Sequence, residues 1–369
     1  MKQIQIGVMG SGQLGQMMCQ EALPSGLSVH CYSPEAGSPA QKAGAIEWVG
    51  SYEDKIQLTK FLSSIGVLSF EFENIPPKTL DFLETWEGKI QIHPKPSILK
   101  IAQDRFLEKS HFKKLGFLTA GFYHLTKNSK SNQIPFGFPW IIKTLKFGYD
   151  GKGQTKVSSE GELQVFLNSA FPTGNEEYLI EEVVKFDLEI SVVGTRFTTG
   201  EFISFGSVEN IHKNHILDTS IFPARIPEAV NQKAWDMAKH LAEDLRYVGT
   251  LGVEFFVKGE VLYLNEFAPR PHNSGHFSQD CESFSQFHLH LMAITGENAP
   301  NKLFPKPTVM RNILGHDFLE RMLKFKDYLK NDRYRLHLYG KETAKTARKM
   351  GHINFKGNFS EIDTEILEI

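Results

Sequence analysis

The chain has 369 residues, of which 41% are hydrophobic and 23% are charged, and its formal net charge is −2. This near-neutral balance excludes a strong general attraction to nucleic acid or to an anionic membrane. The length predicts two or three domains, no apolar run approaches the ~18 residues of a membrane span, and three scattered cysteines (Cys19, Cys31 and Cys281) indicate a reducing cytoplasm.

Residues 1–100 carry no signal-peptide pattern and alternate strand and helix signals, which predicts a parallel sheet with helices on its faces. After the first apolar run, Gly10, Gly12 and Gly15 match the pattern G-x-G-x-x-G before a helix-like segment. Glycines there allow a tight turn, and the helix N-terminus would point free N–H groups at a phosphate. The pattern does not say whose phosphate, and a turn without a ligand stays an alternative.

The proline-containing stretch 93–99 predicts a domain boundary. Residues 100–120 read as helical, and Gly116 closes the helix. From about residue 137 the pattern changes to paired strands with tight turns. A long amphipathic helix is predicted over 231–249, followed by a hairpin over 252–267. The last ~70 residues mix strand signals with a basic segment, 341–349.

Glu254 and Glu266 flank the predicted turn 258–260 of the hairpin. Side chains alternate along strands, so these two carboxylates are predicted to lie on one face, directly or diagonally opposite. Two such charges repel unless a cation lies between them, and Mg²⁺ prefers this kind of ligand. A pair of solvated glutamates is the alternative, although the apolar neighbours disfavour it.

Lys143 precedes a glycine-rich stretch, 148–154, that lies between two predicted strands. Its backbone N–H groups are suited to cover phosphates, and Lys143 would add a point charge. The stretch is not a Walker loop, because it lacks G-K-[ST] and a strand follows it. A glycine-rich hairpin without a ligand is the alternative.

Directly after the hairpin, residues 270–276 read RPHNSGH, a run of multi-donor side chains suited to a small oxyanion such as carboxylate, bicarbonate or phosphate. A polar loop that stabilises itself explains the same residues equally well. The spacing of His272 and His276 fits no zinc pattern. The basic segment 341–349 lacks interleaved aromatic residues, so a solvated turn is preferred there over nucleic-acid binding.

Taken in this order, the features resemble ATP-grasp enzymes, and in detail the family of N5-carboxyaminoimidazole ribonucleotide synthases. The motifs that carry the resemblance span nearly the whole chain: GSGQLGQMM, FEFENIP, GYDGKGQ, ENIHKNHILDTSIFPARI, NEFAPRPHNSGH, SQFHLHLMAITG and LHLYGKETAKTARKMGHIN. The resemblance implies a mixed α/β fold with an N-terminal Rossmann-like domain (1–100), a two-part ATP-grasp domain (101–297, with a lid at about 115–186) and a small β-rich C-terminal domain (298–369).

The implied activity is that of a ligase of purine biosynthesis, which uses ATP to carboxylate 5-aminoimidazole ribonucleotide with bicarbonate, through carboxyphosphate. Its products would be N5-carboxyaminoimidazole ribonucleotide, ADP and phosphate. The resemblance further implies a cytoplasmic homodimer that binds neither nucleic acid nor membrane, and a mutase that later moves the carboxylate to carbon.

The resemblance also assigns roles to individual residues. Mg²⁺ would be held by Glu254 and Glu266, and the catalytic residues would be Lys143, Arg270, His272 and Lys341. ATP would be bound by Arg105, Lys143, Gly148, Tyr149, Asp150, Gly151, Lys152, Gly153, Gln154, Glu181, Glu182, Val183, Val184, Glu189, His212, Asn265 and Glu266. The ribonucleotide and bicarbonate would be bound by Gly12, Gln13, Leu14, Glu73, Tyr149, Asp150, Lys152, Arg270, His272, Asn273, Ser274, Lys341 and Arg348.

Two positions depart from the family pattern. Lys152 stands where relatives often have arginine, so a bidentate grip is lost there. Ala268 stands where many ATP-grasp enzymes have a third metal-binding side chain. Three alternatives remain: an ATP-grasp ligase that uses formate or glycine, an NAD(P)-dependent dehydrogenase suggested by the glycine loop, and a binding protein without activity. For the dehydrogenase, the expected acid after the second strand is ambiguous, because Ser33 ends that strand and Glu35 lies just beyond it.

Overall fold

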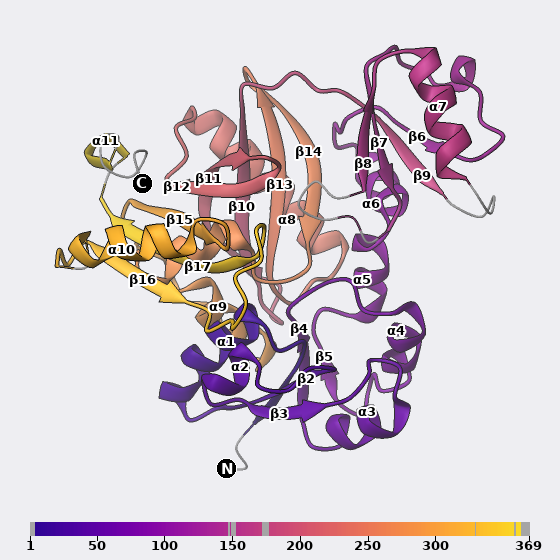
Figure 1. Ribbon diagram of the computed structural model, residues 1–369. Helices are drawn as coiled ribbons and strands as arrows, with labels where there is room; N and C mark the ends of the chain where they lie inside the picture. The colour runs from indigo at the N-terminus through magenta and orange to yellow at the C-terminus, as the bar shows by residue number, and fades with distance from the viewer. Residues whose placement is uncertain are drawn as a thin grey trace.

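Three sheets organise the chain in the computed structural model, which describes residues 4–146, 148, 153–171, 177–328, 330–357 and 359–362 (Figure 1). The strands are β1 (Gln5–Met9), β2 (Ser28–Ser33), β3 (Ile46–Val49), β4 (Val67–Phe70), β5 (Gln91–Ile92), β6 (Phe122–Leu125), β7 (Trp140–Thr144), β8 (Gln154–Val157), β9 (Tyr178–Glu182), β10 (Leu188–Arg196), β11 (Phe202–Lys213), β12 (Ile216–Phe222), β13 (Gly249–Lys258), β14 (Val261–Ala268), β15 (Thr308–Leu314), β16 (Tyr334–Leu338) and β17 (Lys349–Lys356). The α-helices are α1 (Gln13–Ala22), α2 (Pro39–Lys42), α3 (Lys55–Leu62), α4 (Pro77–Glu84), α5 (Pro96–Ala102), α6 (Arg105–Lys114), α7 (Glu160–Ala170), α8 (Glu228–Asp244), α9 (Gln286–Ile294), α10 (Phe318–Tyr328) and α11 (Phe359–Ile362).

The N-terminal sheet has the order β3-β2-β1-β4-β5, and all its strands are parallel. This confirms the fold predicted from the strand–helix alternation. One apolar cluster joins Ile6 and Val8 to Met17 and Met18 of α1, and another packs around Phe61 of α3. Two clusters of this kind are typical of a parallel sheet covered by helices.

The predicted helix over 100–116 is two helices, α5 and α6, separated at Gln103 and Asp104. The Asp104 carboxylate accepts hydrogen bonds from the amides of Phe106 and Leu107. Aspartate is among the strongest N-cap residues, so it starts a new helix where the apolar pattern alone continued the old one. This break puts Arg105 at the first position of α6.

The largest sheet has eight strands in the order β14-β13-β10-β11-β12-β15-β17-β16. Strand β15 pairs with β12, so the strands after residue 298 extend the central sheet and form no separate one (Figure 1). Helix α8 packs on this sheet through Ala234, Ala238 and Leu241. It begins at Glu228 and ends at Asp244, a few residues earlier than the predicted helix at each end.

A third sheet, β6-β9-β7-β8, carries α7 and has its own apolar cluster around Trp140 and Leu163. In Figure 1 it stands apart from the N-terminal sheet, beyond the β13–β14 hairpin. Within the described part of the chain, no helix has both the length and the apolar character required to cross a membrane.

Candidate active site

A cavity of about 620 Å³ lies between the four-stranded sheet and the eight-stranded sheet. A second cavity, of about 490 Å³, lies between the N-terminal sheet and the loop 340–348. Gln13 and Glu71 line both cavities. The two spaces therefore adjoin at the end of the glycine loop.

On the side of the four-stranded sheet, Lys143 of β7 and Glu181 of β9 line the larger cavity. The Lys143 Nζ lies 2.7 Å from Glu181 Oε2, and the Nζ of Lys109 lies 3.4 Å from the other carboxylate oxygen. Burial alone would raise the pKa of Glu181, but the two lysines hold it at about 2. The Glu181 carboxylate is thus paired with two lysines, and Glu181 lines the cavity together with Glu182, Val183 and Val184. Lys109 was not identified from the sequence.

Arg105 contacts both the glycine-rich stretch and the Glu266 carboxylate. Its Nη2 donates to the Gly148 carbonyl at 3.0 Å, and its Nη1 lies 3.4 Å from Glu266 Oε2. Gln154 pairs with Lys143 across the strands, and the Gly153 carbonyl accepts the Thr144 amide at 2.9 Å. The other predicted flap residues, Tyr149, Asp150, Gly151 and Lys152, lie outside the described residues.

At the end of β9, Glu182 is the last strand residue and Val183 and Val184 follow it. Glu189 and His212 lie on β10 and β11, and all five residues line the same cavity. The His212 Nδ1 is 3.1 Å from Glu189 Oε2. Burial alone would lower the pKa of His212, but the bond to Glu189 raises it above its ordinary value. Glu189, His212 and Glu254 also have ligand atoms within 4.8 Å of one another. This end therefore offers both hydrogen-bond donors and acceptors.

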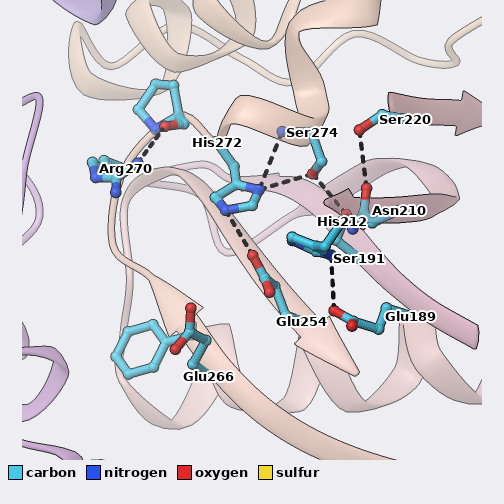
Figure 2. A network of polar contacts seen from close by, with 12 residues as sticks. Glu189, Ser191, Asn210, His212, Ser220, Glu254, Glu266, Arg270, His272 and Ser274 are labelled. Atoms are coloured by element: carbon cyan, nitrogen blue, oxygen red, sulfur yellow. Dashed lines mark hydrogen bonds and ion pairs between the residues drawn. The ribbon is translucent and has the colours of Figure 1, made fainter. Parts of the chain in front are cut away.

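Glu254 and Glu266 lie directly opposite each other on β13 and β14, as predicted (Figure 2). The prediction assumed a three-residue turn, 258–260. The turn in fact has two residues, because Lys258 already pairs with Val261. With that turn a straight ladder would put Asn265 opposite Glu254 and aim Glu266 at the other face. A β-bulge at Asn265 restores the opposition, because one extra residue shifts the register by one.

These two carboxylates fit a magnesium ion. The Glu254 Oε1 accepts a hydrogen bond from His272 Nε2 at 2.9 Å. Burial alone would raise the pKa of Glu254, but this bond lowers it below the ordinary value, so the group is ionised near neutral pH. Opposed carboxylate oxygens are hard ligands of the kind that Mg²⁺ prefers. Ala268 supplies no side-chain ligand.

His272 is held by a chain of buried polar groups (Figure 2). Its Nδ1 accepts a hydrogen bond from the Ser274 amide and also lies 2.8 Å from the Ser274 Oγ. The Ser274 Oγ is in turn 2.6 Å from the Ser191 Oγ. Asn210 donates to Ser191 and accepts from Ser220. The Nδ1 is thus an acceptor, and the Nε2–H faces Glu254. Ser274, predicted to contact substrate, is fully buried behind His272 and orients it.

Arg270 and Glu73, both predicted to contact substrate, bind each other. The Arg270 Nε donates to Glu73 Oε2 at 2.6 Å and Nη2 donates to Oε1 at 3.4 Å. Asn273 lines the same cavity, and neither of the two buried polar atoms of its half-buried side chain has a hydrogen-bond partner among the described residues. A buried amide without partners is available to a ligand.

The glycine loop encloses a carboxylate of this chain itself. Glu71 accepts the amide of Gly12 at 2.5 Å and the amide of Gly15 at 2.8 Å. Gly10 has a φ of +106°, and a Cβ there would lie 2.2 Å from the Glu71 Cγ. The glycines thus admit Glu71, and the Gln13 and Leu14 amides are the remaining donors of the first helical turn. This role of Glu71 was not predicted.

Lys341 and Arg348 line the smaller cavity on its C-terminal side. The Lys341 Nζ donates to the Lys349 carbonyl at 2.7 Å, and Arg348 donates to the Thr343 carbonyl. Burial lowers the pKa of Lys341 to about 8, and the neighbouring Arg348 acts in the same direction. The basic segment therefore contributes two cations to the cavity and is more than a solvated turn.

Three features together are typical of an ATP-grasp ligase. They are a nucleotide-sized cavity between two sheets, a lysine (Lys143) on one of these sheets, and a pair of carboxylates (Glu254 and Glu266) on the hairpin of the other. Models of known families match three parts of the chain: the ATP-grasp domain over 110–287, the ribonucleotide synthetase preATP-grasp domain over 1–103 and the phosphoribosylaminoimidazole carboxylase C-terminal domain over 308–362. The chain is 35% identical over 357 residues to the N5-carboxyaminoimidazole ribonucleotide synthase of Staphylococcus haemolyticus, covering 96% of this chain and 92% of the relative. It is 36% identical over 354 residues to that of Bacillus subtilis, covering 95% and 90%. The chain belongs to the N5-carboxyaminoimidazole ribonucleotide synthase family.

Solved structures of the same family superpose along the whole chain. An ADP complex of an N5-carboxyaminoimidazole ribonucleotide synthetase gives a TM-score of 0.90 at 38% identity, covering 100% of this chain and 97% of that one. The Aspergillus clavatus synthase in complex with ADP and 5-aminoimidazole ribonucleotide gives 0.88 at 27% identity, covering 99% and 97%.

Proposed function

We propose that this chain binds ATP in the larger cavity and 5-aminoimidazole ribonucleotide where the two cavities adjoin, and transfers a carboxyl group to the ribonucleotide amine. The observation that carries the proposal is the shared cavity wall. It joins Lys143 and Glu181 of the lid to Glu73, Arg270 and His272 near the N-terminal sheet. Two substrates can therefore meet in one space, whose lining includes the cations Arg105, Lys143 and Arg270.

At the ATP end, Arg105 and Lys143 would face the phosphates, while Glu189 and His212 would bind the ribose. Residues 182–184 would meet the adenine through the strand end. When bound, Mg²⁺ would supply Lewis-acid stabilisation of the phosphoryl oxygens, held by Glu254 and Glu266.

At the other end, the ribonucleotide phosphate would bind Lys341, Arg348 and the amides of Gln13 and Leu14. The Gly12 amide, predicted as a further donor, is already bound to Glu71. Asn273 would donate to or accept from the substrate, since its amide has no protein partner in the described chain. Arg270, oriented by Glu73, and His272, oriented by Ser274, would gather bicarbonate.

The reaction would proceed in two steps. A bicarbonate oxygen attacks the γ-phosphorus of ATP, the bond to the β-phosphate oxygen breaks, and ADP leaves with formation of carboxyphosphate. The exocyclic amine then bonds to the carboxyl carbon, directly or through CO₂, and loses a proton as phosphate leaves. Lys143 and Arg105 would stabilise the charge of the transferring group.

A phosphate-release assay tests the proposal. With ATP and Mg²⁺, we expect release that depends on both bicarbonate and 5-aminoimidazole ribonucleotide, whereas formate or glycine gives none. Release only with formate or glycine would reassign the chain to another ATP-grasp activity. The same proposal includes a homodimer, which light scattering tests. It also includes domain boundaries near residues 100 and 297 and a mutase that acts on the product.

A further inference from the structure

Lys109 is a buried ammonium that no expected catalytic step uses. It is only 2% exposed and lies on α6, one turn after Arg105. Three acceptors surround its Nζ: Thr119 Oγ1 at 3.2 Å, the Asn265 carbonyl at 3.1 Å and Glu181 Oε1 at 3.4 Å. Thr119 and Asn265 accept hydrogen bonds from this ammonium, and Glu181 is its ion-pair partner, so protein groups hold Lys109 in place.

The Asn265 carbonyl belongs to the β-bulge that puts Glu266 opposite Glu254. Strand β14 is at the edge of its sheet, so its outward backbone groups have no strand partner in the described part of the chain. Segments from α6 onward bind them instead. Glu108 accepts the Phe267 amide at 2.9 Å, Leu118 accepts the Leu264 amide at 2.8 Å, and Lys109 donates to Asn265.

The same ammonium also acts on the lid. Its partner Glu181 holds the Nζ of Lys143 at 2.7 Å through the second carboxylate oxygen. Lys109 therefore contacts both the strand that carries Glu266 and the carboxylate that orients Lys143, on opposite walls of the cavity.

We propose that Lys109 is a positioning residue. By binding both the Asn265 carbonyl of the bulge and the Glu181 carboxylate, it fixes the position of the proposed metal ligand Glu266 relative to that of the phosphate-facing Lys143. This rests on the proposed function for the roles of Glu266 and Lys143. A clamp of this kind explains how an edge strand with a two-residue turn keeps an irregular register. The distance between the two sides of the cavity, one carrying Glu266 and the other Lys143, then depends on the single side chain of Lys109.

Titration of MnCl₂ in the presence of ADP, followed by the electron paramagnetic resonance of free Mn²⁺, tests the clamp without turnover. We expect Lys109→Met to bind Mn²⁺ about 10-fold more weakly, as is typical when a residue that orients a metal ligand is lost. Lys113→Met, exposed on the same helix, is the matched control and is expected to keep wild-type affinity. In steady-state assays Lys109→Met should lower kcat and raise the KM for Mg²⁺, but leave the KM for the ribonucleotide unchanged.

A folded Lys109→Met enzyme with wild-type Mn²⁺ affinity would overturn the proposal, as would an equal loss in Lys113→Met. If Lys109→Met does not fold, Lys109→Arg takes its place, because it keeps the buried charge while its planar fork cannot centre on three acceptors. Wild-type Mn²⁺ affinity in that variant overturns the proposal in the same way. The titration contains neither bicarbonate nor ribonucleotide, so an error in the substrate assignment would leave its result unchanged.

Discussion

Glu266 is the residue whose charge the proposed reaction needs most directly. Glu266→Gln keeps the shape of the side chain but removes the negative charge that faces Glu254 and Arg105. We expect ATP turnover to fall by about 100-fold or more, with the fold intact by circular dichroism. Glu260→Gln, in the exposed turn of the same hairpin, is the control. Wild-type turnover of Glu266→Gln with Mg²⁺ would contradict the metal assignment.

Lys341 predicts a pH dependence of substrate binding. Its pKa is lowered from 10.5 to about 8 by burial and by the neighbouring cations Arg348 and Lys349, against the attraction of Glu71. A phosphate-binding ammonium is lost as the pH rises through this value, so the KM for the ribonucleotide should rise above pH 8. The unfolded chain holds the proton up to the ordinary value, so between these two pH values this group favours folding increasingly as the pH rises.

The pH profile of kcat/KM for the ribonucleotide, recorded from pH 7 to 9.5, measures this effect. Lys341→Met should weaken binding at neutral pH and remove the step near pH 8. A step that persists in the variant would assign the titration to another group.

Among single residues, the sequence predicted those that lie in extended motifs and missed those that act through tertiary contacts. Lys143 and Arg270 stand in recognisable patterns and line the cavity as expected. Glu71 follows a strand, and only the fold brings it to the glycine loop. Lys109 did have a signal, since it lies four residues after Arg105 and therefore on the same helix face.

At the scale of elements, β13 passes unusually close to the loop that carries His272. A Cβ built on Gly252 would lie 2.6 Å from both Cβ and Cγ of His272. Those atoms sit near the backbone and cannot turn aside, so the strand accepts only glycine at this point. This close approach puts the imidazole within hydrogen-bond distance of Glu254.

Gly252→Ala is therefore expected to lower the free energy of unfolding by about 1–3 kcal/mol, the usual effect of overpacking. The displaced imidazole should also lower ATP turnover. Urea denaturation measures the first effect, with Gly161→Ala as the control, because a Cβ there would meet the Ser159 Oγ at an ordinary contact distance of 4.0 Å. Equal stability of Gly252→Ala and wild type would show that the loop moves freely.

The predicted boundaries of helices and strands were wrong where a helix cap or a β-bulge overrides the periodicity of apolar residues. The apolar pattern continued one helix through residue 104, and the Asp104 cap divided it. The hairpin was placed correctly, yet its turn is one residue shorter than predicted. Both differences are decided by backbone hydrogen bonds, which an apolar pattern does not record.

At the scale of the whole molecule, His290 of α9 connects the N-terminal sheet to the central one. Its Nδ1 accepts the Thr250 amide at 3.0 Å, and its Nε2 lies 2.8 Å from the Ser69 hydroxyl of β4. Burial lowers the pKa of this imidazole to about 3, so it is neutral and donates from Nε2. The pairing of β15 with β12 is a second long-range connection that no local pattern predicts.

Ser69→Ala leaves the buried Nε2–H of His290 without an acceptor. We expect the free energy of unfolding to fall by about 1–3 kcal/mol, measured by urea denaturation. Ser63→Ala, which removes an exposed hydroxyl, should change it by less than about 0.5 kcal/mol. An equally small change in Ser69→Ala would show that the imidazole finds another partner.

The bulge at Asn265 also determines which changes of chain length this hairpin can tolerate. Deleting Asn265 alone straightens the ladder, keeps Glu266 opposite Glu254 and leaves Leu262 and Leu264 on the buried face. Deleting any residue from 261 to 264 instead moves at least one side chain of β14 from one face of the sheet to the other. Among natural homologues, a shorter version of this strand should therefore have lost its residue at position 265, together with the acceptor that Lys109 binds.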